Sequence, residues 1–537
     1  MCSMPLYCWP FVAFNQICRG TYDYSAQYVV YLKTLKIIAH TIFVLLLIFF
    51  AFDFSSCKKD KITTDPKARV EFSQDSVLFD TVFTGIGSST RNIRVRNKNK
   101  QRIKIASIHL RGGSTSAFIL NVDGAKGTDF QNVEIAANDS IYIFIQVHIN
   151  PNNANSPAIV NDALDFSVNG QTQTLVLEAW GQDAYYHMPT NAFKYKDGTY
   201  FAYSIIDTLK NSYTRNGNDF IWKNDKPHVI YGYLAVDSLQ HLIIPAGTKV
   251  YLNYKAGIWV YNCGQIKVMG EKDKEVIFQG ARLEKDYADE PGQWDRIWIN
   301  EGSDGNVIDY AIIKNAFIGV QAELFFPNNF YGKGSLTITN TRIQNMSKWG
   351  IYGLAYKIYG GNNVVVNCQE SCFNAMYGGS YKFYHCTFAN YWNKDKPRDQ
   401  ACINLNNYTD LQVLQDTFYF GNCIIDGKLN NELNLDLKSD ASVKPVYAFN
   451  NCWIRTTLNT VNNGYYFNVR SSSTDNLLYK DTDHYNFEPD AKETRIQKFA
   501  NALAEKDAAY YPFDIKMQSR YTTVASGGVT AGAYEIP

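Results

Sequence analysis

The second half of the chain repeats one pattern of apolar and polar positions. Each copy starts and ends with an apolar residue, with a polar or aromatic residue and then a small residue or Cys at its centre. The five copies begin at Ile308, Ile338, Phe383, Phe420 and Phe449. Short strands that meet at a polar corner and recur at loose spacing predict a solenoid of stacked coils.

The region before the solenoid also alternates between apolar and polar residues, from Val70 to Leu177. Turns rich in Gly, Asn and Asp, such as Gly112-Gly113 and Asn169-Gly170, separate its short runs. Strands of this length and spacing are typical of an immunoglobulin-like β-sandwich. We therefore predict an all-β protein in which an Ig-like β-sandwich precedes a parallel β-helix solenoid.

Changes in composition divide the chain into six predicted segments. Near the C-terminus, a helix that covers the last coil is predicted within 494–506, because Ile496, Phe499, Ala500 and Leu503 recur at helical spacing. The predicted segments are a leader (1–56), a tether (57–66), the Ig-like sandwich (67–183), a Tyr-rich connector (184–224), the β-helix (225–490) and a C-terminal cap with its tail (491–537).

The N-terminal segment has the layout of an export signal. Lys33 and Lys36 precede an apolar run over 37–52, and Ser55-Ser56 stand directly before Cys57. This arrangement resembles a bacterial lipoprotein signal, which implies lipid attachment at Cys57 and a place in the cell envelope on the outer membrane, at its surface or periplasmic face. An uncleaved membrane anchor and an ordinary buried Cys are the alternatives. Translation is expected to start inside the leader, for example at Val29.

The composition of the chain limits which classes of binding partner are expected. Tyr, Phe and Trp make up 15% of residues while charged residues make up only 19%, and the formal net charge is +1. No basic stripe interrupts this balance, so nucleic acid is not expected as a partner.

Several motifs carry resemblances to known families. Phe79-Asp80-Thr81-Val82, Asn138-Asp139-Ser140 and Trp180-Gly181 resemble sandwich modules of the ASPM/SPD-2/hydin type, which implies an adaptor or spacer. The segment from Gly257 to Trp298 resembles the opening of right-handed parallel β-helix proteins of the pectate-lyase-like superfamily. The tail, with Asp514, Arg520 and Gly532-Ala533-Tyr534-Glu535, resembles the end of exported bacterial β-helix proteins. These resemblances imply a surface protein whose partner is a polysaccharide or a cell-surface glycan.

Two residue types recur in register. Cys386, Cys423 and Cys452 share one position of the repeat, which predicts an inward column of buried thiols. One or two disulfides, or a zinc site at Cys368, Cys372 and His385-Cys386, are the alternatives. The remaining cysteines after Cys57 are Cys263 and Cys402. The second recurrent type is Asn at the corner, which predicts a hydrogen-bonded ladder of Asn340, Asn422 and Asn451.

The segment 284–296 carries the most chemistry. It places five carboxylates beside a Pro-Gly turn, and the candidate catalytic residues are Asp289, Asp295, Arg296 and Glu301. The alternative is a solvated loop that Arg296 braces. Calcium is the only cofactor such a loop suggests, and we expect neither calcium nor another metal, because no dedicated calcium-loop spacing is present.

The motifs of related enzymes are incomplete. The chain contains no Asp-Asp and no Gly-His-Gly, which argues against a polygalacturonase-type hydrolase. The strand from Arg296 resembles a pectate-lyase strand, but Asn300-Glu301 stand where Asp-His is expected.

Four tryptophans could form stacking platforms for sugars, although buried aromatic stacks are the alternative. They are Trp294, Trp298, Trp349 and Trp392. The leading hypothesis is a lipoprotein that binds polysaccharide, the second is a polysaccharide lyase or glycosidase, and the third is a structural or adhesive surface protein.

Overall fold

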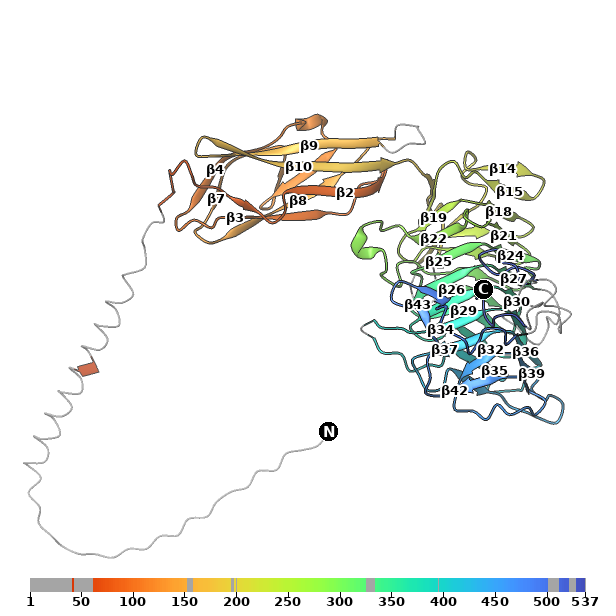
Figure 1. Ribbon diagram of the computed structural model, residues 1–537. Coiled ribbons are helices and arrows are strands. Elements are labelled where there is room, and N and C mark those ends of the chain that lie inside the picture. Colours follow the sequence, from red (N-terminus) through yellow and green to blue (C-terminus); the bar gives the residue numbers. More distant parts are fainter. Residues whose placement is uncertain are drawn as a thin grey trace, which may run out of the picture.

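The computed structural model describes residues 41–42, 61–151, 158–194, 198, 200–324, 334–394, 396–500, 511–520 and 528–536. The described chain forms a β-sandwich followed by a parallel β-helix solenoid, joined end to side (Figure 1). Cys57, the predicted lipid site, lies outside the described residues. Among the residues that the structure describes, no helix has the length and apolar character needed to cross a membrane.

The β-sandwich consists of two five-stranded sheets around one core. β8 shows why these strands form: Ile141, Ile143, Ile145 and Val147 point inward at alternate positions, while polar and aromatic residues point outward. The 3-10 turn η1 (Gly113–Thr115) follows β4. In spatial order the first sheet is β1 (Glu71–Phe72), β3 (Arg91–Arg96), β8 (Ser140–Val147), β5 (Phe118–Val122) and β6 (Ala125–Gly127). The second is β2 (Ser76–Phe83), β10 (Gln171–Gln182), β9 (Ala158–Val168), β4 (Ile103–Leu110) and β7 (Asp129–Ile135).

The solenoid has three long sheets, and successive coils add one strand to each. Sheet 1 contains β11 (Tyr185–His187), β16 (His228–Ile230), β19 (Lys249–Leu252), β22 (Val276–Gly280), β25 (Ala311–Lys314), β28 (Arg342–Met346), β31 (Val364–Cys368), β34 (Thr387–Asn390), β37 (Ile424–Gly427), β40 (Trp453–Arg455) and β42 (Arg470–Ser472). Sheet 2 contains β12 (Asn191–Lys194), β13 (Tyr200–Ile205), β17 (Tyr233–Val236), β20 (Gly257–Val260), β23 (Ile297–Ile299), β26 (Ile318–Glu323), β29 (Trp349–Leu354), β32 (Phe373–Met376), β35 (Ile403–Asn406) and β38 (Leu433–Asp436). Sheet 3 contains β14 (Tyr213–Asn216), β15 (Asp219–Trp222), β18 (His241–Pro245), β21 (Gln265–Met269), β24 (Asn306–Asp309), β27 (Leu336–Thr339), β30 (Lys357–Gly361), β33 (Gly379–Tyr384), β36 (Asp416–Gly421), β39 (Tyr447–Asn450) and β41 (Tyr466–Phe467).

The predicted repeat is the corner between sheet 3 and sheet 1. Its central polar or aromatic residue has a positive φ in all five copies, between 46° and 54°, which turns the chain within a single residue. Asn tolerates this left-handed conformation better than most residues, which explains its recurrence. These corner residues are Tyr310, Asn340, His385, Asn422 and Asn451.

Hydrogen bonds connect the corner residues in short stretches. Asn362 Nδ2 donates to Asn340 Oδ1 at 3.1 Å, and Asn468 Nδ2 donates to Asn451 Oδ1 at 2.6 Å. Asn422 pairs with His385 rather than with another Asn, at 3.0 Å. Each of the three predicted Asn residues therefore bonds to one neighbouring corner residue, and the described bonds form separate pairs rather than the predicted ladder of Asn340, Asn422 and Asn451.

The predicted cysteine column is buried. Cys386, Cys423 and Cys452 follow the corner residues, each is fully buried, and the Cys423 amide donates to Cys452 Sγ at 3.4 Å. All seven cysteines of the described chain are free thiols, and Cys263 is the exposed one.

Three boundaries differ from the sequence expectation. The segment 184–224 is not a connector, because β11 to β15 form the first strands of all three sheets. The solenoid ends at β42, since β43 (Tyr479–Asp481) and β44 (Asn486–Pro489) pair only with each other. The tether is partly ordered onto the sandwich, where the Thr63 amide donates to the Arg102 carbonyl at 2.8 Å.

The C-terminal segment covers sheet 1 instead of capping the last coil with a helix. The described part of the predicted helix, 494–500, forms turns, and 501–506 lie outside the described residues. Ile496 and Phe499 nevertheless pack on Ile424 and Trp453 of sheet 1. Figure 1 shows the C-terminus beside the middle of the solenoid.

Candidate functional site

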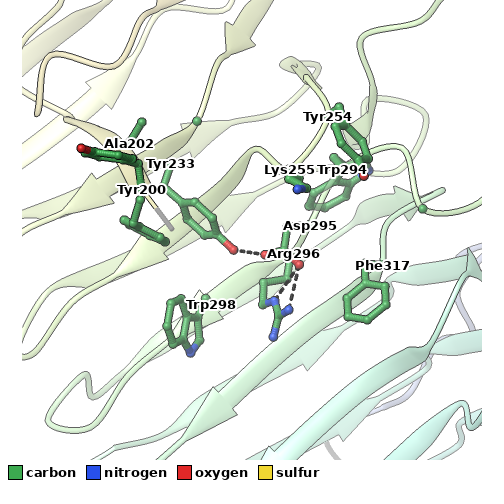
Figure 2. Close-up of a pocket in the computed structure, with 13 residues that line it drawn as sticks. Tyr200, Ala202, Tyr233, Tyr254, Lys255, Trp294, Asp295, Arg296, Trp298 and Phe317 are labelled. Atoms are coloured by element: carbon green, nitrogen blue, oxygen red, sulfur yellow. Dashed lines mark hydrogen bonds and ion pairs between the residues drawn. The ribbon is translucent and has the colours of Figure 1, made fainter. Parts of the chain in front are cut away.

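A concave cavity lies on the outer face of sheet 2, over its first coils. It has a volume of about 590 Å³, and most of its wall is aromatic. Figure 2 shows Trp298 and Phe317 on opposite sides of Arg296, with Tyr233 pointing at Asp295. The aromatic lining residues are Tyr200, Phe201, Tyr233, Tyr254, Trp294, Trp298 and Phe317.

Strand register brings the aromatic side chains together. Trp259 of β20 is in register with Trp298 of β23, and their rings stack at 6.0 Å. Phe201 packs on Tyr233 at 4.6 Å and meets Trp259 edge-on at 5.4 Å. Neighbouring strands in a sheet lie about 4.8 Å apart, so aromatic residues at one position on successive coils pack against one another.

Asp295 and Arg296 form the polar floor of the cavity. Arg296 Nε donates to Asp295 Oδ1 at 2.9 Å, and the Tyr233 hydroxyl donates to Asp295 Oδ2. The backbone holds this pair in place, because the Asp295 amide donates to the Ala256 carbonyl and the Arg296 carbonyl accepts from the Ile258 amide. A coil corner thus presents a paired carboxylate and guanidinium to the cavity.

A buried carboxylate extends this polar network along sheet 2. Glu323 Oε1 accepts from Trp298 Nε1 at 2.6 Å and from Asn300 Nδ2 at 3.1 Å. Gln321 connects the two acidic groups, because it donates to Glu323 Oε2 and accepts from Arg296. Burial raises the pKa of the Glu323 carboxyl above its ordinary value, and the neighbouring donors oppose this rise only in part.

The structure brings together three of the residues predicted from sequence. Asp295, Arg296 and Trp298 all line the cavity. Trp294 also contacts it but is only 1% exposed, and its indole donates to the Lys314 carbonyl, so it belongs to the wall rather than to an open platform. Glu301 follows β23 beside the network, and its Oε2 has no hydrogen-bond partner among the described residues.

The other predicted residues lie elsewhere. Trp349 sits further along sheet 2, where it packs on Tyr352 at 4.3 Å. Trp392 is not a stacking platform, because it is only 8% exposed and its indole donates to the Lys396 carbonyl. Asp289 does not line the cavity, and its backbone carbonyl accepts from Asn345 and Lys394.

Sequence reasoning missed Glu323, Gln321 and Tyr233. Coil length varies along the chain, so no fixed spacing connects Trp298 with Gln321 even though the two are directly in register. The usable signal was a recurring Gly-apolar pair. Gly319-Val320 lies near the start of β26, and Gly350-Ile351 lies at the matching position of β29 in the next coil.

The acidic groups of the described chain are not arranged as a metal site. No group of three or more His, Cys, Asp or Glu side chains within the described ranges is placed to hold an ion. In the loop 284–296, Glu284 pairs with Arg282 at 3.0 Å and Asp295 pairs with Arg296 at 2.8 Å. Local cations therefore neutralise two of the five carboxylates.

The arrangement combines aromatic rings with fixed polar groups. Aromatic rings pack on apolar ring faces, while a fixed carboxylate–guanidinium pair offers acceptors and donors side by side. Each oxygen of Asp295 and Glu323 accepts at least one hydrogen bond from a protein side chain. These contacts hold both carboxylates as positioning groups.

Comparisons with known proteins give only distant likenesses. No protein-family model and no curated sequence matches the chain. The catalytic unit of a GH87 α-1,3-glucanase from Streptomyces thermodiastaticus strain HF3-3 is 9% identical, with 62% of this chain and 66% of that chain covered and a TM-score of 0.24. A protein of unknown function from Porphyromonas gingivalis W83 is 14% identical (24% and 50% covered, TM-score 0.17). A family 123 glycoside hydrolase from Clostridium perfringens is 12% identical (21% and 26% covered, TM-score 0.16). The chain thus spans half or less of the last two proteins, and at these TM-scores the likenesses say nothing of its function.

Proposed function

We propose that the chain is a cell-envelope lipoprotein that binds polysaccharide in the cavity on sheet 2. The observation that carries this proposal is the convergence of aromatic rings on the Asp295–Arg296 pair in one concave site. A sugar ring has apolar faces that stack on aromatic side chains, and hydroxyls that need both donors and acceptors. Tyr254, at 70% exposed, offers such an aromatic face at the rim.

The rest of the molecule fits this role. Lipid at Cys57 would hold the chain on the outer membrane, and the sandwich, as an immunoglobulin-like spacer of the ASPM/SPD-2/hydin kind, would carry the solenoid away from it. Contacts such as the ring pair Phe83–Tyr251, at 5.1 Å, fasten the sandwich to the solenoid. Cys57→Ala should move the protein out of the detergent phase, and a mature chain that begins well upstream of Cys57 would refute the anchor.

A polysaccharide-degrading enzyme is the second candidate. The favouring observation is the raised pKa of Glu323, which lies three hydrogen bonds from Asp295, through Arg296 and Gln321. A carboxyl that stays protonated can act as a general acid beside a carboxylate. Release of unsaturated or reducing-end sugars that disappears in Glu323→Gln would favour this candidate.

A binding assay with matched variants tests the main proposal. On an array of immobilised polysaccharides, Tyr254→Ala should weaken binding about five- to tenfold, because it removes one stacking face. Tyr142→Ala is the control, since Tyr142 is exposed on the sandwich and away from the cavity. Equal binding by wild type and Tyr254→Ala would contradict the proposal.

A further inference from the structure

One row of outward side chains runs from the cavity along sheet 2 to its last strand, β38. Strand register aligns its members across seven consecutive coils. At about 4.8 Å per coil the row is about 29 Å long. In order its members are Trp259, Trp298, Gln321, Tyr352, Asn374, Asn404 and Asn434.

The chemistry of the row changes along its length. The first two positions are indoles, and the last three are amides on β32, β35 and β38. The residues that flank Asn374 and Asn404, such as Phe373 and Ala375, are fully buried, so these two amides lie on the outer face of the sheet, where Asn434 is exposed. An amide presents a donor and an acceptor together, which is the pair that two adjacent hydroxyls require.

Asn374 carries a buried polar atom on this row. It is only 7% exposed, yet its Oδ1 has no hydrogen-bond partner in the described part of the chain. A buried amide oxygen without a partner is uncommon and costs free energy, because it has lost its water. A ligand hydroxyl over β32 would supply the missing hydrogen bond.

Charge next to the row selects among ligands. No member of the row is charged. The adjacent outward positions include Glu323 and Asp436, and the guanidinium of Arg296 beside the row is already paired with Asp295. Asp436 accepts from Asn406 at 3.0 Å and from the Tyr408 hydroxyl, so it is held at the edge of the row. An acidic sugar would meet carboxylates, whereas a neutral sugar would meet amides and rings.

We infer that sheet 2 is a continuous binding track for an extended, uncharged polysaccharide, anchored at Trp298 and held by the amides of Asn374, Asn404 and Asn434. This inference rests on the proposed function, because the anchor is the same cavity. The glycan lies along the solenoid axis, one coil after another. Uronate-rich and sulfated glycans are excluded from the track by charge.

The test uses the whole chain with defined probes. Mannan, xylan and mixed-linkage glucan are the neutral probes, and polygalacturonate and dextran sulfate are the acidic ones. For the neutral polysaccharide that binds best, the affinities of its disaccharide and of its hexasaccharide are then compared. We expect the hexasaccharide to bind at least tenfold more tightly than the disaccharide, because only the longer chain reaches the amides.

Variants separate the track from the cavity. Asn404→Ala/Asn434→Ala should weaken hexasaccharide binding about tenfold and leave disaccharide binding unchanged. Asn92→Ala, at an exposed position of the sandwich strand β3, is the matched control. Thermal unfolding midpoints equal to that of the wild type would exclude a folding defect.

Each outcome is decisive. Binding of neutral chains that depends on length and on the two amides supports the track. Binding of acidic probes alone, equal affinity for both oligosaccharides, or no effect of the double variant overturns the track but leaves the cavity proposal standing. Failure of every probe overturns both.

Discussion

Sheets 1 and 2 belong to the same coils but differ in what covers their outer faces. Outward residues of sheet 1 such as Val364, Val366 and Ala389 are apolar and buried under the C-terminal segment, which supplies Phe487 and Ala533. The row of outward residues on sheet 2 from Trp259 to Asn434 consists of indoles, amides and one tyrosine, and it borders the cavity and its continuation.

The difference separates stabilisation from recognition. A solenoid sheet with an apolar outer face must be covered, and the chain uses its own tail to cover sheet 1. Under the proposed function, sheet 2 carries side chains that gain from a polar, ring-shaped ligand. On that proposal the same strand geometry serves two purposes, and the outward residues decide which.

The largest expected effect concerns the ion pair that fastens the tail. Arg520 and Glu535 are almost fully buried and pair at 2.9 Å, and Arg520 also donates to Asn362 at 3.0 Å. Arg520→Ala should lower the free energy of unfolding by about 3–5 kcal/mol, because it leaves a buried carboxylate unpaired. Denaturant unfolding measures this loss.

The control for this prediction replaces both partners. Arg520→Met/Glu535→Leu should be far closer to wild type, since no buried charge remains unpaired. A double variant as unstable as Arg520→Ala would show that packing, rather than charge, holds the tail.

Much of this division could be predicted from sequence. The corner residues could be predicted because a left-handed φ favours Asn, and the apolar positions around them predicted which side chains point into the coil. Glu323 could not be predicted, because its role depends on register with Trp298 across coils of unequal length. The helix expected over 494–506 failed for a tertiary reason: Ile496 and Phe499 pack on sheet 1, and Ala500 pairs with Val529 of the tail.

A smaller effect concerns a buried histidine pair at the start of sheet 1. His187 Nε2 and His228 Nδ1 lie 2.9 Å apart, and Trp222 stacks on His228 at 3.8 Å. Burial lowers the pKa of His228 to about 4, and burial together with the facing His228 lowers the pKa of His187 well below its ordinary value. The Lys223 carbonyl, 2.8 Å from His228 Nε2, and to a lesser extent Asp225 oppose the lowering of the His228 pKa only in part.

The sign of the pH effect follows from these shifts. Below about pH 6.5 the unfolded histidines bind protons while the folded ones stay neutral, so the free energy of unfolding should fall as the pH drops toward 4. The slope should be about 1.4 kcal/mol per pH unit for each histidine. Urea unfolding at several pH values should give a flatter profile for His187→Gln/His228→Gln, and an unchanged slope would contradict this assignment.

The cysteine column should resist alkylation in the native state. Burial raises the pKa of the Cys423 thiol well above its usual range, and Cys386 and Cys452 are equally inaccessible. Exposed Cys263 is the internal control and should react at once. Replacing Cys423 by Ser should cost about 1–3 kcal/mol, because it buries a hydroxyl in an apolar stack. Peptide mapping that finds rapid native labelling of the column would refute this.

The smallest expected effect is that of calcium on the acidic loop. A tightly bound ion at a hundredfold excess over its Kd would stabilise the fold by about 2.7 kcal/mol. Because Arg282 and Arg296 already pair with carboxylates there, midpoints with millimolar calcium and with chelator should agree. If calcium instead raised the unfolding midpoint by several degrees and this rise disappeared in Asp289→Asn/Asp295→Asn, the result would favour a lyase-like mechanism.

Side-chain footprinting of the chain with and without a neutral polysaccharide tests the central claim most directly. The account predicts that hydroxyl-radical labelling falls at Trp298 and Tyr352 of sheet 2 and at Tyr254 on the rim of the cavity. It should stay unchanged at Trp180, which is exposed on the sandwich. Protection of Trp180 with full labelling of the sheet 2 residues would contradict the account.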